Sequence, residues 1–156
     1  MEAVKIRKNR QYRSFEVRAG EVVNNGEMWV EGYAVIFNSP TVLFSDEGID
    51  YCEQIDARAF DNANMDDVIF NYNHTGHVMA RIKNGTLELK IDEKGLFIRA
   101  RLDGTQEGQE IYRNIKDGYI DKMSFQFTIA NDIYDRANHL DTICIVTGKQ
   151  IGRAHV

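Results

Sequence analysis

Short segments in which apolar and polar residues alternate run through the chain, and this pattern restricts the fold more than any other feature. The clearest is residues 87–92, whose odd positions are apolar and whose even positions are charged. An alternation of period two is what a half-buried β-strand requires. Asn84-Gly85 before it suits a type I′ hairpin, and Glu93-Lys94-Gly95 after it offers a second turn. We therefore predict a three-stranded meander made of residues 78–83, 86–92 and 96–102.

Other segments predict further strands. Residues 14–18 and 28–37 are expected to pair as a hairpin across Asn24-Asn25-Gly26. Residues 38–48 contain the only proline and several turn-forming residues, so we expect a loop there rather than a paired strand. The remaining strands are expected at residues 49–55, 68–72 and 121–129.

Two helices are expected beside these strands. Asp56 is placed to cap a short helix over residues 57–64, with Phe60 as its buried residue. Thr105 is placed to cap an amphipathic helix over residues 106–117. Many short strands with two helices predict an α+β domain that is mostly β: a small mixed β-barrel or a strongly curved sheet with flanking helices.

Length and charge exclude several classes of protein. The 156 residues, 43% of them hydrophobic, suit one ordinary domain with a core of its own. A net charge of -5 gives no basic face for nucleic acid or an anionic membrane. No apolar run approaches the roughly 20 residues that span a bilayer, and the polar N-terminus lacks the apolar core of a signal peptide. We therefore expect a soluble cytoplasmic protein without nucleic-acid or membrane partners.

A serine and a histidine are the candidates for chemistry. Ser124 lies in the strand at residues 121–129, and its side chain is expected to face away from the large apolar neighbours Met123 and Phe125. Serine is a poor nucleophile unless a nearby base takes its proton, and His74 follows the end of the strand at residues 68–72. From the pattern alone both alternatives stay open, because a serine on the outer face of a strand and a histidine beside a turn are most often plain surface residues.

Metal and thiol chemistry are not expected. His74 and His77 have a spacing that can ligate a metal, but a site needs three or four ligands and no third is nearby in the sequence, so His77 is interpreted as a solvated loop histidine. Cys52 and Cys144 lie far apart without a CxxC spacing and are interpreted as buried or incidental thiols. We predict no metal and no cofactor.

Residues from about 30 to 130 contain a series of short motifs: Glu31-Gly32-Tyr33-Ala34 with Phe37, Glu53, Ala59-Phe60, Asn73-His74, Ala80-Arg81, Gly85-Thr86-Leu87-Glu88-Leu89, Glu93-Lys94-Gly95-Leu96, Asp117-Gly118-Tyr119-Ile120 and Met123-Ser124-Phe125-Gln126-Phe127. Of these, Glu53 and Phe60 are interpreted as architectural residues. The N-H and S-F-x-F motifs are weak singly, but their ordered combination with the G-T-L and G-L motifs between them is specific. In order and spacing, these segments resemble the prohead (capsid maturation) serine proteases of HK97-type tailed bacteriophages.

The resemblance implies a serine endopeptidase whose fold is similar to that of the herpesvirus assemblins, a small β-barrel wrapped by helices. It implies that His74 is the general base and Ser124 the nucleophile of acyl-enzyme chemistry. Members of this family cleave the scaffold or delta segment of the major capsid protein, and often themselves, inside the immature prohead. The implied partners are therefore the major capsid protein with its scaffold segment and further copies of the protease, in the cytoplasm of a bacterium that carries the phage or prophage.

The chain departs from the family pattern in three places. Ala80 and Gln126 stand where the family often has glycine, and neither change is expected to abolish the site. The family resemblance also leads us to expect an acidic residue on a strand after the serine, in an E-V-S element that the chain lacks. His139 and Asp141 follow Ser124, but Asp141 lies too early to be nominated, so the third triad member is predicted to be missing.

These departures divide the chain into three expected parts. Residues 1–13 are expected to be an N-terminal extension and residues 14–143 the protease domain, incomplete at its C-terminal end. Residues 144–156 are expected to be a non-native tail, because their closing Ile-Gly-Arg-Ala-His-Val resembles a translated sequencing adapter. Two alternatives to an active protease remain from the sequence: a non-catalytic capsid assembly or scaffold-binding module, and an inactive fragment of the protease.

Overall fold

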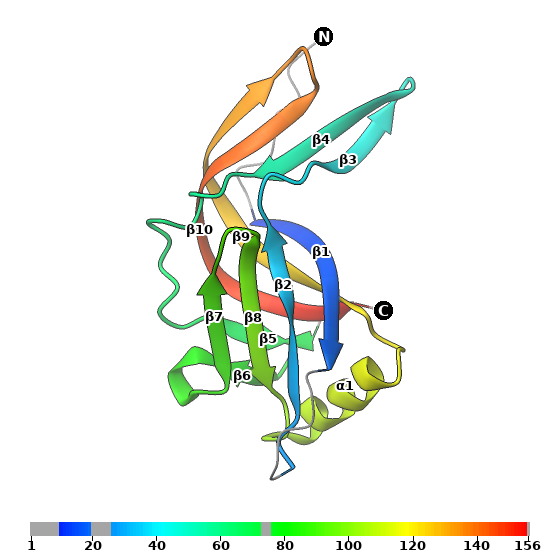
Figure 1. The fold of residues 1–156 in the computed structure, drawn as a ribbon, viewed down its shortest axis with the longest axis vertical. Helices are drawn as coiled ribbons and strands as arrows, with labels where there is room; N and C mark the ends of the chain where they lie inside the picture. The colour runs from blue at the N-terminus through cyan, green and yellow to red at the C-terminus, as the bar shows by residue number, and fades with distance from the viewer. Residues whose placement is uncertain (1–9, 20–25, 73–75, 156) are drawn as a thin grey trace.

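A strongly curled sheet forms most of the molecule (Figure 1). The computed structural model describes residues 10–19, 26–72 and 76–155. The strands follow one another across the sheet in the order β3-β4-β10-β9-β1-β2-β8-β7, and β5 pairs with β10 and β6. Their bounds are β1 Arg10–Ala19, β2 Trp29–Ile36, β3 Thr41–Asp46, β4 Ile49–Ile55, β5 Ile69–Asn71, β6 Val78–Arg81, β7 Leu87–Ile91, β8 Gly95–Arg101, β9 Lys122–Asp135 and β10 Leu140–His155.

The predicted hairpin near the N-terminus is confirmed. β1 pairs antiparallel with β2, and its other edge pairs antiparallel with β9. β1 begins at Arg10, four residues before the strand that the alternation predicts. The predicted turn at Asn24-Asn25-Gly26 lies mostly outside the described residues. Through β1, the N-terminal hairpin is joined to the strand that carries Ser124.

The hydrophobic core lies on the concave side of the curled sheet. β2 and β8 contribute fully buried aliphatic residues, and β9 contributes Phe125 and Phe127, whose rings stack with their centroids 5.5 Å apart. Phe60 meets Phe125 edge to face at 5.5 Å. The aliphatic members of this core that are fully buried include Val30, Ala34, Val35, Leu96, Ile98, Ala100 and Leu102.

The helix α1, Gln106–Lys116, closes one end of the core and agrees with the prediction to within one residue. The Thr105 hydroxyl accepts a hydrogen bond from the Gly108 backbone N–H at 2.9 Å, which caps the first turn. Ile111, Tyr112 and Ile115 form its buried face. The flank of α1 beside this buried face, from Glu107 to Asn114, borders the hollow described below.

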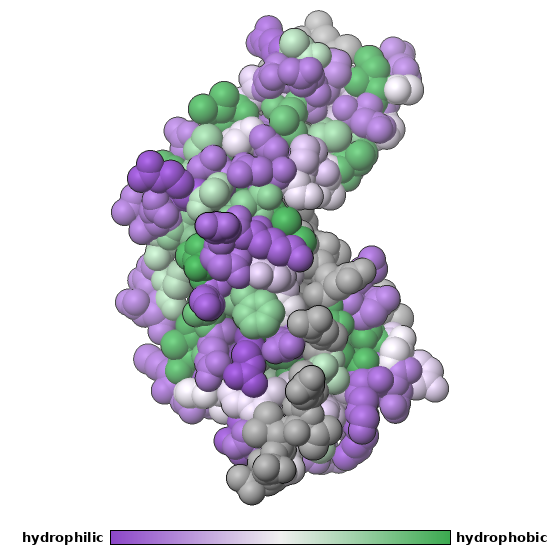
Figure 2. Space-filling view, viewed as in Figure 1, coloured by the Kyte–Doolittle hydropathy of each residue, from purple (hydrophilic) through white to green (hydrophobic). Residues whose placement is uncertain are grey.

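The prediction of a loop at residues 38–48 is wrong. β3 pairs antiparallel with β4, and the two strands meet in a two-residue turn at Glu47-Gly48, both with positive φ. Every residue of β3 is exposed, so burial imposes no alternation on its sequence, and Pro40 stands just outside the strand, where its missing N–H costs no pairing. In Figure 2 a notch separates the part of the molecule that carries β3 and β4 from the main body.

The predicted helix at residues 57–64 is also wrong, although Phe60 is buried as expected. The segment is a series of turns in which Ala59 N–H bonds to the Asp56 carbonyl and Ala63 N–H to the Phe60 carbonyl. The Ala59 carbonyl, which a helix would use four residues later, instead accepts the Val146 N–H of β10 at 3.1 Å. Hydrogen bonds to a distant strand therefore replace the local helical ones.

The predicted meander is half right. β7 and β8 form the expected antiparallel pair, but β6 pairs with β5 and is followed by the single 3₁₀ turn η2, Ile82–Asn84. A type I′ turn needs two residues with positive φ, and of the pair only Gly85 has one. The Ile82 N–H bonds to the carbonyl of Val68, next to β5, which draws this end of β6 away from β7.

The fold class is thus mostly β, with one α-helix in the described part of the chain where two were predicted. The sheet is a strongly curled half-barrel. Within the described residues, no helix is long and apolar enough to cross a membrane. Residues 144–155 continue β10, and their assignment as a non-native tail stays a prediction.

Candidate active site

Ser124 is the third residue of β9, close to the point where the chain enters the sheet after α1. Its backbone lies between Ser14 of β1 and Gly152 of β10 in the strand register. Two residues later, Gln126 is only 4% exposed, so it is part of the packed interior and does not extend into solvent. The structure therefore places the predicted nucleophile near one end of an interior strand with a neighbour on each side.

His74 lies outside the described residues. In the sequence it stands between β5 and β6, which the structure describes. β5 ends at Asn71 and β6 begins at Val78, and the two strands pair antiparallel. The segment that contains His74 therefore connects the two strands of a hairpin.

An ion pair joins the strands at the base of this hairpin. The Arg81 guanidinium donates hydrogen bonds to both carboxylate oxygens of Asp67, one of them from Nε to Oδ1 at 3.2 Å. The guanidinium beside Asp67 holds the pKa of that carboxyl below its ordinary value. Arg81 belongs to the Ala80-Arg81 motif, and its contacts with Asp67 are structural, because they hold the end of β6 against the segment that leads into β5.

The sheet register brings this hairpin toward Ser124. Gln150 of β10 pairs with Ile69 of β5 on one side and with Gln126 of β9 on the other. β5 and β9 are thus two strand positions apart, roughly 10 Å at the usual spacing between strands.

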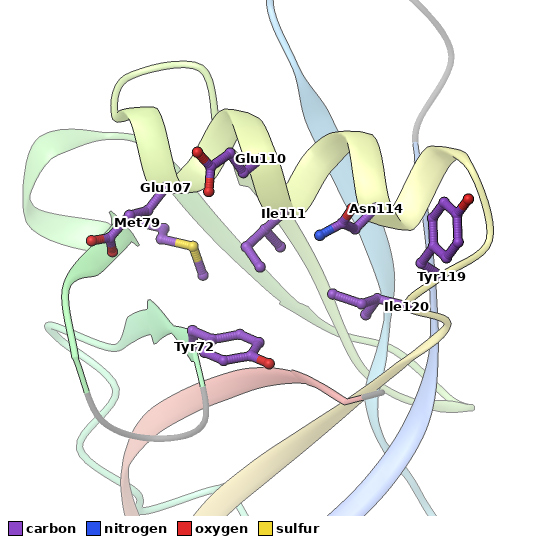
Figure 3. Close-up of a pocket in the computed structure, with 8 residues that line it drawn as sticks. All are labelled: Tyr72, Met79, Glu107, Glu110, Ile111, Asn114, Tyr119 and Ile120. Atoms are coloured by element: carbon purple, nitrogen blue, oxygen red, sulfur yellow. The ribbon is translucent and has the colours of Figure 1, made fainter.

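A groove of about 530 Å³ lies between α1 and the end of β5 (Figure 3). One side is formed by α1 from Glu107 to Asn114, and the other includes Tyr72, two residues before His74. Ile120, four residues before Ser124, lines the same groove. The two chain segments that carry the predicted catalytic residues therefore border one hollow. Its lining residues are Tyr72, Met79, Glu107, Glu110, Ile111, Asn114, Tyr119 and Ile120.

Sequence reasoning missed this groove. The sequence assigned no binding role to Glu107, Glu110 or Tyr119. Tyr119 is 74% exposed, which is unusual for so large a side chain. The groove combines residues from positions 72 to 120, so local spacing could not reveal it.

Asp141 is too far along the strands to serve as the third member of a triad. It pairs in register with Tyr134 of β9, ten residues from Ser124, which is about 33 Å of extended strand. Asp141 is also fully buried, beside the buried Glu53 of β4 in the parallel register of β10 with β4. The burial of Glu53 agrees with its interpretation as an architectural residue.

Metal and thiol chemistry find no support in the described part of the chain. No group of three or more potential metal ligands occurs there. The side chain of His77 is 81% exposed, which confirms the interpretation of a solvated histidine, and its Nδ1 lies 3.5 Å from Glu107. Burial raises the pKa of the Cys144 thiol, which disfavours the reactive thiolate.

Comparison with known proteins decides the family. The model of the Caudovirus prohead serine proteases matches residues 13–151, which is most of the chain. The chain belongs to this family. No curated protein and no solved structure matches it. The family resemblance stated from the motifs is thereby confirmed, and the family is one of serine proteases that act in capsid maturation.

Proposed function

We propose that this chain is the serine endopeptidase that cleaves the scaffold or delta segment of the major capsid protein during capsid maturation. Membership of the prohead protease family supports the reaction class. The observation that carries the assignment to particular residues is the groove, because Tyr72 and Ile120 bring the segments around His74 and Ser124 to one hollow. An extended peptide laid in this hollow passes close to both segments.

In the proposed reaction, His74 accepts the proton of the Ser124 hydroxyl as the hydroxyl oxygen attacks the carbonyl carbon of the scissile peptide bond. The same histidine then gives that proton to the leaving amine, so the peptide bond breaks and an ester to Ser124 remains. Water, deprotonated by His74, hydrolyses the ester and restores the serine. Asp141 takes no part in this scheme, because it lies at the other end of β9 from Ser124.

The biological setting follows from the family. Substrate and protease meet inside the immature shell, which assembles in the host cytoplasm, and further copies of the protease are both partners and substrates. A curled half-barrel with a helix at one end is compatible with a fold similar to the herpesvirus assemblins. We propose no metal and no cofactor for the reaction.

The test is co-expression with the capsid protein from the same phage genome, read by gel electrophoresis and intact mass. Ser124→Ala and His74→Ala should each abolish the cleavage, since loss of a triad member typically lowers the rate by about a thousandfold or more. Ser39→Ala and His139→Asn are the matched controls. Neither residue lines the groove, and asparagine tolerates the positive φ of position 139.

The outcomes separate the alternatives. Cleavage that survives in both active-site variants would refute the assignment of Ser124 and His74. Intact capsid protein that still co-purifies with the unmodified chain would instead favour a non-catalytic assembly module.

A further inference from the structure

The floor of the groove along α1 is apolar. Met79 of β6, Ile111 of α1 and Ile120 are buried side chains that line it, and the ring of Tyr72 lies across from α1 (Figure 3). An apolar floor of this kind binds hydrocarbon, because contact with it removes apolar surface from water.

One end of the groove is acidic. Figure 3 shows the carboxylates of Glu107 and Glu110 beside Met79, at the end of the groove opposite Tyr119. The two glutamates are three residues apart on α1, so they share one face of the helix. They also line a second hollow of about 530 Å³ next to His77. Among the described residues that line the two hollows, none is a lysine or an arginine.

We propose that this end of the groove is a subsite for a lysine or arginine side chain of the bound peptide. A hydrocarbon stem with a cationic end matches both features, since the stem covers the apolar floor while the charge stays at the wet, acidic rim. An acidic residue would be repelled at the rim, and a purely apolar residue would gain no attraction from the two carboxylates. The inference rests on the proposed function only in naming that peptide a substrate.

The subsite is remote from the bond that is cut. The segment of α1 from Glu107 to Asn114 spans about 10 Å, and residues 120 to 124 span at most about 13 Å of extended chain. At about 3.3 Å per residue of extended peptide, the basic residue lies roughly three to seven residues from the scissile bond. The subsite therefore selects a position in the cleaved segment without contacting the reacting atoms.

A binding assay tests this without relying on catalysis. The full chain carrying Ser124→Ala is titrated into fluorescein-labelled twelve-residue peptides of alanine, glycine and serine. Each peptide carries one leucine and, three residues from it, lysine, norleucine or glutamate. Fluorescence anisotropy should show the lysine peptide binding about tenfold more tightly than the norleucine peptide, with the glutamate peptide weakest. The difference should shrink at high salt.

Variants of the rim locate the effect. Glu107→Gln and Glu110→Gln should each lower the preference for lysine about threefold to fivefold, and the double variant should remove it, while the affinity for the norleucine peptide stays the same. Glu93→Gln is the control, because it removes the same charge from the exposed turn between β7 and β8. Circular dichroism should show all four variants folded.

Equal affinities for the lysine and norleucine peptides, no binding of the lysine peptide at about 1 mM, or a preference that survives the double variant would each overturn the subsite. Capsid cleavage without any preference for basic residues would overturn the subsite and leave the proposed function standing. Lysine-selective binding by a chain that never cleaves capsid protein would support the subsite and overturn the proposed function.

Discussion

A methyl group added at Gly108 should destabilise the protein, against the usual trend for glycine in a helix. Gly108 is the third residue of α1, and a β-carbon built there lies 2.2 Å from the carbonyl oxygen of Leu102 and 2.9 Å from the Thr105 hydroxyl oxygen. The Leu102 carbonyl cannot retreat easily, because the residue is fully buried and its N–H bonds to the Met28 carbonyl at 2.7 Å. Therefore α1 itself must shift by about 1 Å to accommodate alanine.

Three effects determine how far the free energy of unfolding falls in Gly108→Ala. Overpacking against a fixed backbone costs about 1 to 3 kcal/mol, and disturbing the Thr105 cap costs about 1 kcal/mol more. Alanine regains at most about 1 kcal/mol through its higher helix propensity. The free energy of unfolding of Gly108→Ala should therefore fall by about 1 to 3 kcal/mol, which for a chain of this size lowers the melting temperature by roughly 3 to 9 °C.

Equilibrium unfolding in urea, followed by circular dichroism, measures this loss. Gly104→Ala is the control: a β-carbon there meets nothing within 4 Å, so its free energy of unfolding should change by less than about 0.5 kcal/mol. The shift of α1 should also weaken peptide binding in the groove, because α1 is one of its walls. A Gly108→Ala protein as stable as the unmodified chain would refute the steric argument, since propensity would then outweigh the contact with Leu102.

Three further outcomes are expected. Thr105→Ala should lower the free energy of unfolding by about 1 kcal/mol through loss of the α1 cap, and Thr105→Ser should restore it in the same urea titration. Phe60→Ala should cost about 3 to 5 kcal/mol, because it removes a buried ring that packs against Phe125. The pKa of Asp67 is lowered by its hydrogen bonds with Arg81. The pair therefore contributes fully to the free energy of unfolding above about pH 4, and this contribution is lost as the pH falls through the folded-state pKa of Asp67. Asp67→Asn should therefore be less stable than the unmodified chain at pH 7, and in acid unfolding this difference should shrink as the pH falls below about 4.

The parts of the fold that the sequence predicted are those governed by neighbouring residues. The alternation at residues 87–92 and the cap at Thr105 each act within a few positions, and β7 and α1 appear where they were expected. β3 was missed because all of its side chains are exposed, so its only organising force is backbone pairing with β4. The turns at residues 57–64 were missed because their bonding partner, β10, lies more than eighty residues away.

The candidate site likewise combines residues that the sequence predicts with a groove that it does not. Ser124 and His74 could be nominated because the motifs that carry the family resemblance are short and their residues are neighbours in sequence, and their catalytic roles stay a prediction. The groove could not be named, because Tyr72, Met79 and Ile120 meet only after the strands have paired and α1 has packed. Residue chemistry thus predicts which groups react, whereas the shape that selects a substrate is a property of the assembled fold.

The exposed glutamates of α1 can therefore determine specificity with little effect on stability. Its buried face, which includes Ile111 and Ile115, holds it against the core, whereas Glu107 and Glu110 are exposed at the rim of the groove. Changing the exposed pair removes no buried contact, so the helix should keep its position while the charge presented to the peptide changes. Substitutions on this face should consequently change which peptides bind and leave the free energy of unfolding within about 0.5 kcal/mol of the unmodified chain.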